Sequence, residues 1–178
     1  MGAFHFSAQP LLLADGGWDM NCPYNDPSDD IPDGGTFAFD GTLSWDPTSG
    51  QTWFTFQGGT WDAGFDGQNV IASGSAARTF AACCAAVQLV ETMDVALLSV
   101  SQTQAVGGGC PANPLDGGVP APNDAGITAP GSTPVGFDAL LACGTLTDQV
   151  ALGSGAASCD AGLCVACTWR YSVSGVRR

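Results

Sequence analysis

The sequence predicts an all-β fold, a disulfide-stapled antiparallel β-sandwich or jelly-roll-like domain, and three observations favour this class. Apolar residues fall on alternate positions in several segments of strand length. The 25 glycines and 11 prolines suit short strands joined by turns better than helices. The eight cysteines are an even number, as expected where thiols pair in an oxidising compartment. With 178 residues, we expect residues 1–178 to form a single β domain.

The best-defined element is a hairpin over residues 36–61. In the first strand, one face carries alternating apolar side chains, namely Phe37, Phe39, Leu43 and Trp45. Residues 46–50 have the composition of a turn, with Asp, Pro, Ser and Gly. The second strand follows at 51–57, with Phe54 and Phe56 on one face and Trp53 on the other.

The remaining elements are predicted in chain order from the same alternation. Residues 4–6 indicate a short edge strand and 69–80 a longer strand. Residues 85–102 also fit a helical stripe, but their β-branched residues favour a strand. Residues 137–152 fit either a strand pair or a short helix. The chain ends in a strand whose apolar face carries Val165, Cys167, Trp169, Tyr171 and Val173.

Residues 107–134 differ in composition from the rest of the chain. They hold six of the 11 prolines and seven glycines, so they cannot bury enough side chain to offset the entropy of ordering. We expect a long Gly/Pro/Asp-rich loop or linker within the single domain.

The charge of the chain is strongly acidic. Sixteen Asp and one Glu face four Arg and no Lys, giving a formal net charge of −13. This charge repels nucleic acid and anionic membrane surfaces, so neither is an expected partner. The sequence also contains no run of about 20 apolar residues that would predict a transmembrane segment.

The cysteines are predicted to form disulfides, and eight cysteines leave the connectivity open. They are Cys22, Cys83, Cys84, Cys110, Cys143, Cys159, Cys164 and Cys167. Cys159 and Cys164 flank a tight turn and are a candidate pair, whereas adjacent Cys83 and Cys84 are expected to bond different partners. Zinc is the alternative, because Cys164 and Cys167 have a Cys-x2-Cys spacing, although this spacing occurs only once.

Three residues form the candidate ligand site. Trp53 and Trp61, with Asp40 nearby, offer aromatic rings for a sugar face and a carboxylate for sugar hydroxyls. The alternative for the tryptophans is packing against a second sheet. Trp45 and Trp169 lie on apolar faces and are predicted to be core.

Further acidic residues suggest other sites. Asp26, Asp29, Asp30 and Asp33 crowd one loop and are candidate ligands of Ca²⁺, which prefers oxygen; the alternative is a solvated acidic loop. Glu91 lies in line with apolar residues, so a strand there makes it a buried or cleft-facing acid, unless a bulge or strand end lets it reach water.

No catalytic residues are predicted. The single histidine, His5, lies between two phenylalanines near the N-terminus, which weakens every scheme that needs a histidine base. The enzyme question stays open, with a non-catalytic protein favoured.

The spacer over residues 115–126, LDGGVPAPNDAG, resembles the Asp-Gly-Gly and Asp-Ala-Gly punctuation common in exported lipoproteins of myxobacteria. That resemblance implies a secreted or cell-surface setting and supplies no site residues. The expected function is therefore a non-catalytic extracellular or cell-envelope module for binding or structure, with a glycan or protein partner. The alternatives are a carbohydrate-binding or carbohydrate-active domain and a self-assembling virion or surface-lattice subunit.

Overall fold

The structure is a computed structural model, which describes residues 1–13, 15–17, 19, 21–22, 35–56, 58–79, 83, 86–110, 139–152 and 164–178. The described chain is all-β apart from one short helix. The strands are β1 (Ala3–Pro10), β2 (Phe37–Trp45), β3 (Thr52–Phe56), β4 (Gly59–Phe65), β5 (Asn69–Arg78), β6 (Val87–Ser99), β7 (Ala139–Ala151) and β8 (Cys167–Arg177).

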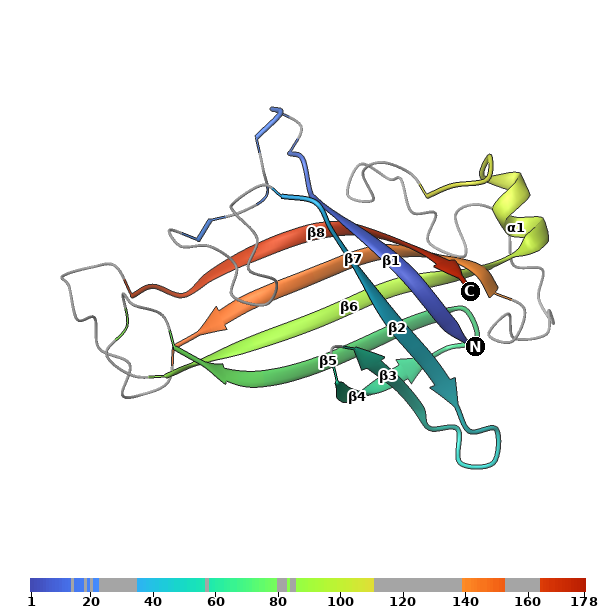
Figure 1. The fold of residues 1–178 in the computed structure, drawn as a ribbon, viewed down its shortest axis with the longest axis horizontal. Coiled ribbons are helices and arrows are strands. Elements are labelled where there is room, and N and C mark those ends of the chain that lie inside the picture. Colours follow the sequence, from blue (N-terminus) through green and yellow to red (C-terminus); the bar gives the residue numbers. More distant parts are fainter. Residues whose placement is uncertain are drawn as a thin grey trace.

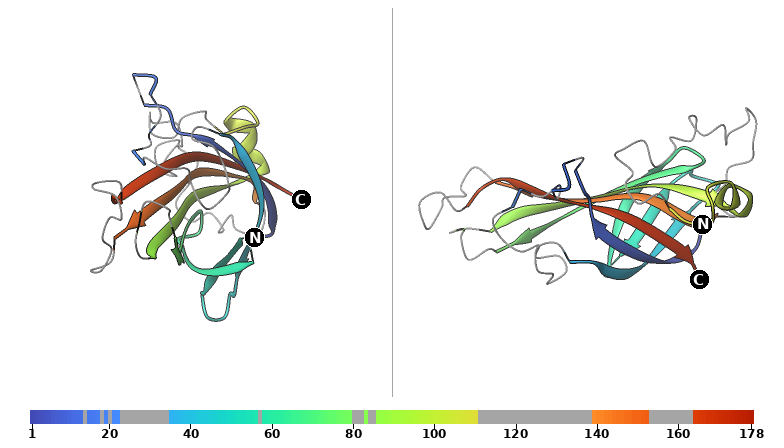
Figure 2. Two further views of the ribbon diagram at one scale, coloured as in Figure 1. Left: turned by 60° about the vertical axis from the view of Figure 1, so that its left-hand side comes forward. Right: turned by 90° about the horizontal axis from the view of Figure 1, so that it is seen from above.

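The eight strands form one closed antiparallel barrel in sequence order, not the predicted sandwich or jelly roll. Each strand pairs with the next, and β8 pairs with β1 to close the sheet. β1 is therefore paired on both sides and is not the short edge strand that was expected. Figure 1 shows β5 to β8 running side by side, with β1 and β2 crossing them steeply and both chain ends lying close together. Figure 2 shows the sheet curving round on itself.

The predicted hairpin is present, with its turn at 46–50. The carboxylate of Asp46 accepts hydrogen bonds from the backbone N–H of Thr48 at 2.8 Å and from the hydroxyl of Ser49 at 2.7 Å. Gly50 has φ of +72°, a conformation that favours glycine. These bonds fix the turn and therefore the register of β2 against β3.

The barrel interior is filled by apolar side chains, which are mainly those on the alternating apolar faces that the sequence predicts. Phe37, Phe39 and Leu43 of β2 and Phe54 and Phe56 of β3 point inward, as does the predicted apolar face of β8 from Cys167 to Val173. Trp169 is buried as predicted, whereas Trp45, at the end of β2, is only half-buried and contacts the ring of Phe65. Phenylalanine rings contact one another at centroid distances of 4.5–5.9 Å. An interior of this kind is expected for an eight-stranded barrel, which is just wide enough for side chains to fill.

The long strands resolve two predictions that were ambiguous in sequence. Residues 87–99 form a strand that is paired along its whole length, so the predicted strand is confirmed there and the helical alternative is wrong. Residues 139–151 form one strand, neither a strand pair nor a short helix. The helix α1 (Val100–Ala105), which the sequence did not predict, follows β6 directly and begins with a capping box between Ser99 and Gln102.

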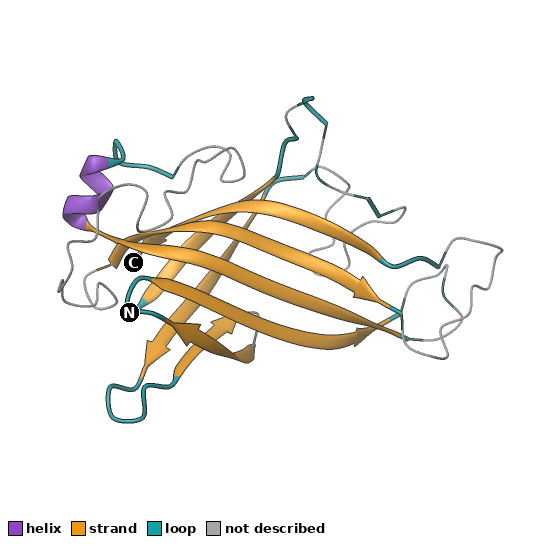
Figure 3. Ribbon diagram, turned by 180° about the vertical axis from the view of Figure 1, so that it is seen from behind, coloured by secondary structure: helices purple, strands orange, loops and turns teal. Residues whose placement is uncertain are grey.

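α1 and the turn after it lie at one end of the barrel, outside its wall (Figure 3). A small cluster of Leu98, Leu141 and Cys143 is buried beside Val106 and Cys110 on this outer side. The larger part of the predicted 107–134 loop, from residue 111 onward, lies outside the described residues.

Candidate functional site

The structure separates the three predicted ligand-site residues. Trp53 lies on the outer face of the barrel, Trp61 on the inner face, and Asp40 on the outer face but further along β2. Asp40 is four residues from Ser44, the residue opposite Trp53. Four residues of strand span about 13 Å, so Asp40 is not in contact range of the Trp53 ring.

Trp61 packs inside the barrel. Its ring meets those of Phe54 and Phe56 edge-on, at centroid distances of 5.6 and 5.5 Å. It also occupies the space in front of Gly74, where an added Cβ would lie 2.5 Å from the indole Cδ1 and Cε2. This placement corresponds to the packing alternative for Trp61, except that its partners are strands of the same closed sheet.

Asp40 belongs to a charged cluster that joins the two chain ends. Its carboxylate oxygens lie 2.7 Å from His5 Nδ1 and 2.8 Å from Arg178 Nη1. Arg178 also donates its backbone N–H to the carbonyl of Ala3 at 3.0 Å. The hydrogen bond from His5, followed by the charge of Arg178, lowers the pKa of Asp40. Asp40 is thus engaged with basic side chains, which favour its ionised form.

We name the outer surface around Trp53 the Trp53 face. The half-buried indole lies opposite Ser44 of β2 and opposite exposed Asp62 of β4. The other outward side chains of these three strands near the ring are exposed hydroxyls, namely Thr42, Thr55 and Thr60. The hydroxyls of Thr55 and Thr60 lie 3.2 Å apart, which orders this part of the surface. The Trp53 face thus presents one aromatic ring among hydroxyls and a carboxylate.

Beyond the Trp53 face, the outer wall curves round the barrel onto β5 and β6. Ile71, which is 52% exposed, lies opposite Gly64 of β4 on one side and Asp94 of β6 on the other. Burial, and then the nearby negative charge of Asp66, raise the pKa of Asp94. Asp66 is held in place by the backbone N–H groups of Gln68 and Asn69, at 2.9 and 2.7 Å. The outer wall of β3 to β6 therefore carries an acidic character beyond Asp62.

A second acidic feature lies inside the barrel. Glu91 of β6 is directly opposite Asp148 of β7, and the two residues are 7% and 0% exposed. Trp169 of β8 lies opposite Asp148 on its other side, and Gly74 of β5 lies opposite Glu91 on its other side. Glu91 is therefore buried, and the alternative in which a bulge or strand end lets it reach water is wrong. Asp148 was missed, because it lies in a segment whose periodicity was ambiguous in sequence.

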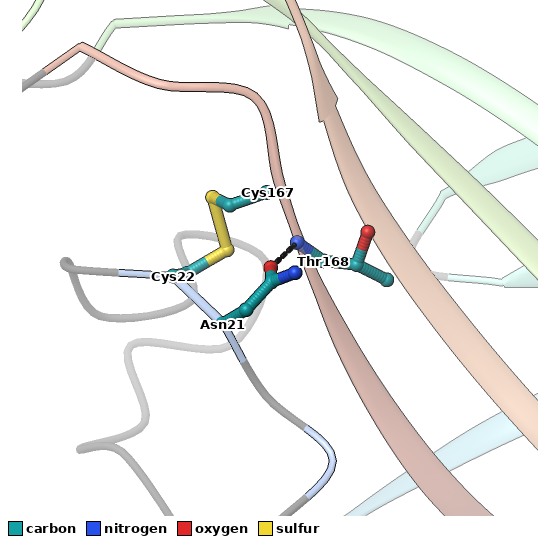
Figure 4. Close-up of a disulfide and its surroundings, with 4 residues drawn as sticks. All are labelled: Asn21, Cys22, Cys167 and Thr168. Carbon is teal, nitrogen blue, oxygen red and sulfur yellow. Dashed lines mark hydrogen bonds between the residues drawn. A yellow bond between two sulfur atoms is a disulfide. The ribbon is translucent and has the colours of Figure 1, made fainter.

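Three disulfides join described cysteines: Cys22–Cys167, Cys83–Cys164 and Cys110–Cys143. Figure 4 shows the first, beside a hydrogen bond of 2.7 Å from the backbone N–H of Thr168 to the side-chain oxygen of Asn21. The suggested Cys159–Cys164 bridge was wrong, because Cys164 bonds Cys83. Bonding also removes the Cys-x2-Cys thiols as zinc ligands.

Several predictions lie outside the described residues. These include the cysteines Cys84 and Cys159 and the candidate calcium ligands Asp26, Asp29, Asp30 and Asp33. Among the residues that the structure does describe, no group of three or more His, Cys, Asp or Glu side chains could hold a metal ion. The described residues also contain no helix with the length and apolar character needed to cross a membrane.

Comparison with known proteins gives no further guide to this site. No family model, no curated protein and no solved structure matches the chain. A functional conclusion therefore rests on the geometry of the site and the chemistry of its residues.

Proposed function

We propose that this protein is a non-catalytic binding module of the cell exterior or cell envelope, and that it binds a glycan on the Trp53 face. The observation that carries the proposal is the position of Trp53. A large aromatic side chain remains half-exposed on a barrel wall whose neighbouring outward residues are hydroxyls and a carboxylate.

The chemistry of this face suits a sugar ring. A pyranose has an apolar C–H face that can lie on an indole, and hydroxyls round its rim that exchange hydrogen bonds with Ser, Thr and Asp. Ser44 and Asp62 lie on opposite sides of the indole, each with its Cβ about 5 Å from that of Trp53. Polar partners are thus available on both edges of a sugar stacked on the ring.

The exterior setting is supported by the cysteine chemistry. Three disulfides among the described residues are typical of proteins that fold in oxidising compartments. The resemblance of the 115–126 spacer to exported myxobacterial lipoproteins points to the same setting. A glycan of the cell surface or of the surroundings is a partner that this location makes available.

The proposal is tested with a glycan array followed by calorimetric titration of the oligosaccharides that bind. Trp53→Ala should weaken binding at least tenfold, because an aromatic anchor near the centre of a site contributes well over 1 kcal/mol. Trp53→Phe, which keeps a smaller ring, should retain part of the affinity. Gln149→Ala, on the exposed outer face of β7, is the control and should bind as the parent protein does.

The folded state of each variant is checked by thermal unfolding. Because Trp53 points outward, its replacement should change the free energy of unfolding by no more than about 1 kcal/mol. Glycan binding that is the same in Trp53→Ala and in the parent protein would rule out the proposal.

A further inference from the structure

We infer that the glycan on the Trp53 face is a cationic amino sugar, a chain of pyranose rings that carry protonated amines. This inference rests on the proposed function and adds the class of sugar. The charges that surround Trp53 support it in three ways.

An aromatic ring and a carboxylate are paired on this face. Asp62 lies directly opposite Trp53, so its side chain is within reach of a group placed over the indole. An ammonium group there would contact the ring face through a cation–π interaction and the carboxylate through a charge-assisted hydrogen bond. A neutral hydroxyl at the same position would gain neither interaction in full.

The acidic character repeats along the wall. Asp94 lies on the outer wall three strands from Trp53 and two residues further along, roughly 16 Å when followed along the curved sheet at the usual strand spacing and rise. Because the eight strands close a barrel, a glycan that reaches both positions would have to follow the curvature of the wall. Exposed Ile71 lies next to it and offers an apolar surface for a further ring. Burial, and then the negative charge of Asp66, disfavour ionisation of Asp94, and a bound cation would favour its charged form. The wall therefore has two separated positions for positive charge.

Positive charge is lacking on this part of the chain. Residues 36–77 contain four Asp and no Lys, Arg or His. The basic side chains that reach β2, His5 and Arg178, are both held at Asp40. With a net charge of −13, the protein repels glycans that carry carboxylates or sulfates.

The test compares four β-1,4-linked or α-1,4-linked oligomers of equal length by calorimetry: glucosamine, N-acetylglucosamine, glucose and galacturonate. The titrations are run at a mildly acidic pH that keeps the amines of glucosamine protonated. The glucosamine oligomer should bind most tightly, and added salt should weaken its binding more than that of the neutral oligomers.

The matched variants are Asp62→Asn and Asp15→Asn, which each remove one exposed carboxylate. Asp62→Asn should weaken binding of the glucosamine oligomer about fivefold, as expected for one exposed ion pair, and leave binding of glucose oligomers unchanged. Asp15, whose carboxylate accepts a hydrogen bond from the backbone N–H of Gly17, lies in the segment after β1 and not on the Trp53 face, so its replacement should have no effect.

The outcomes separate the two proposals. If Trp53→Ala abolishes glycan binding but glucosamine is not preferred, or Asp62→Asn has no effect on it, the amino-sugar inference is wrong and the glycan-binding proposal stands. Preferred binding of galacturonate also overturns the inference. If no glycan binds in a way that depends on Trp53, both proposals fail.

Discussion

Trp61 and Gly74 should be energetically coupled, because the indole occupies the space that a side chain at position 74 would need. Trp61→Ala removes a half-buried ring with two edge-on contacts to phenylalanines, so we expect a loss of about 3 kcal/mol in the free energy of unfolding. Gly74→Ala places a Cβ 2.5 Å from two indole atoms, and overpacking of this kind costs about 1–3 kcal/mol.

The double variant distinguishes packing from ligand binding as the role of Trp61. Without the indole, the methyl group that Gly74→Ala introduces has room and fills part of the space. Replacing glycine by alanine also restricts the unfolded chain, which stabilises by about 0.4–1 kcal/mol. The double variant should therefore be no less stable than Trp61→Ala alone, which corresponds to a coupling energy of about 2 kcal/mol. Urea unfolding of the four proteins measures the cycle. If the two effects add within about 0.5 kcal/mol, the indole does not occupy this space and the packing interpretation is wrong.

Two further predictions concern charge and disulfides. Partial burial of Asp66 acts to raise its pKa, but hydrogen bonds from Asn69 and Gln68 outweigh burial and hold the pKa below its usual value. The ionised carboxylate therefore stabilises the fold at a pH above the usual pKa of Asp, and this contribution is lost as the pH falls. Asp66→Asn should therefore reduce the loss of stability that occurs below about pH 4. By removing a nearby charge it should also lower the pKa of Asp94 as measured by NMR, and an unchanged Asp94 titration would contradict the assigned cause. Replacing both members of Cys22–Cys167 by Ala should destabilise more than replacing both members of Cys110–Cys143. The chain-entropy term grows as 1.5RT ln of the sequence separation, so separations of 145 and 33 differ by about 1.3 kcal/mol. Urea unfolding that ranks the two double variants in the reverse order would contradict this account.

The inward faces of the strands could be predicted from the sequence, because a two-residue period places alternate side chains on one side of a strand. The side of the sheet on which Trp61 lies could not be predicted in this way. Phe54 and Phe56 point inward at even positions of β3, whereas Trp61 points inward at an odd position of β4. The change of parity arises in the turn between these strands, which includes Gly58 with φ of +78°. A turn that differs by one residue would place Trp61 outside.

The sequence pattern also could not predict which strands pair with one another. A strand with one apolar face is equally suited to a sandwich and to a barrel, because both bury one side of a sheet. The barrel closes through pairing of β1 with β8, which joins residues far apart in the chain, such as Phe6 with Gly175. The helix α1 was missed for a different reason, since six residues are too few to show a helical period.

The inward glycines carry the signal that favours closure. Gly41 and Gly175 lie on the inner face, and a Cβ at either would come within about 2.6 Å of a phenylalanine ring, that of Phe54 or Phe6. Gly74 has the same relation to Trp61. An eight-stranded barrel has a narrow interior, so large rings fit only where the facing positions lack side chains. A sandwich does not impose this limit, because its two sheets can pack further apart where rings meet. Glycine at inward positions of aromatic-rich strands therefore indicates that the sheet curves back on itself, and Gly41 within the aromatic face of β2 is such a position.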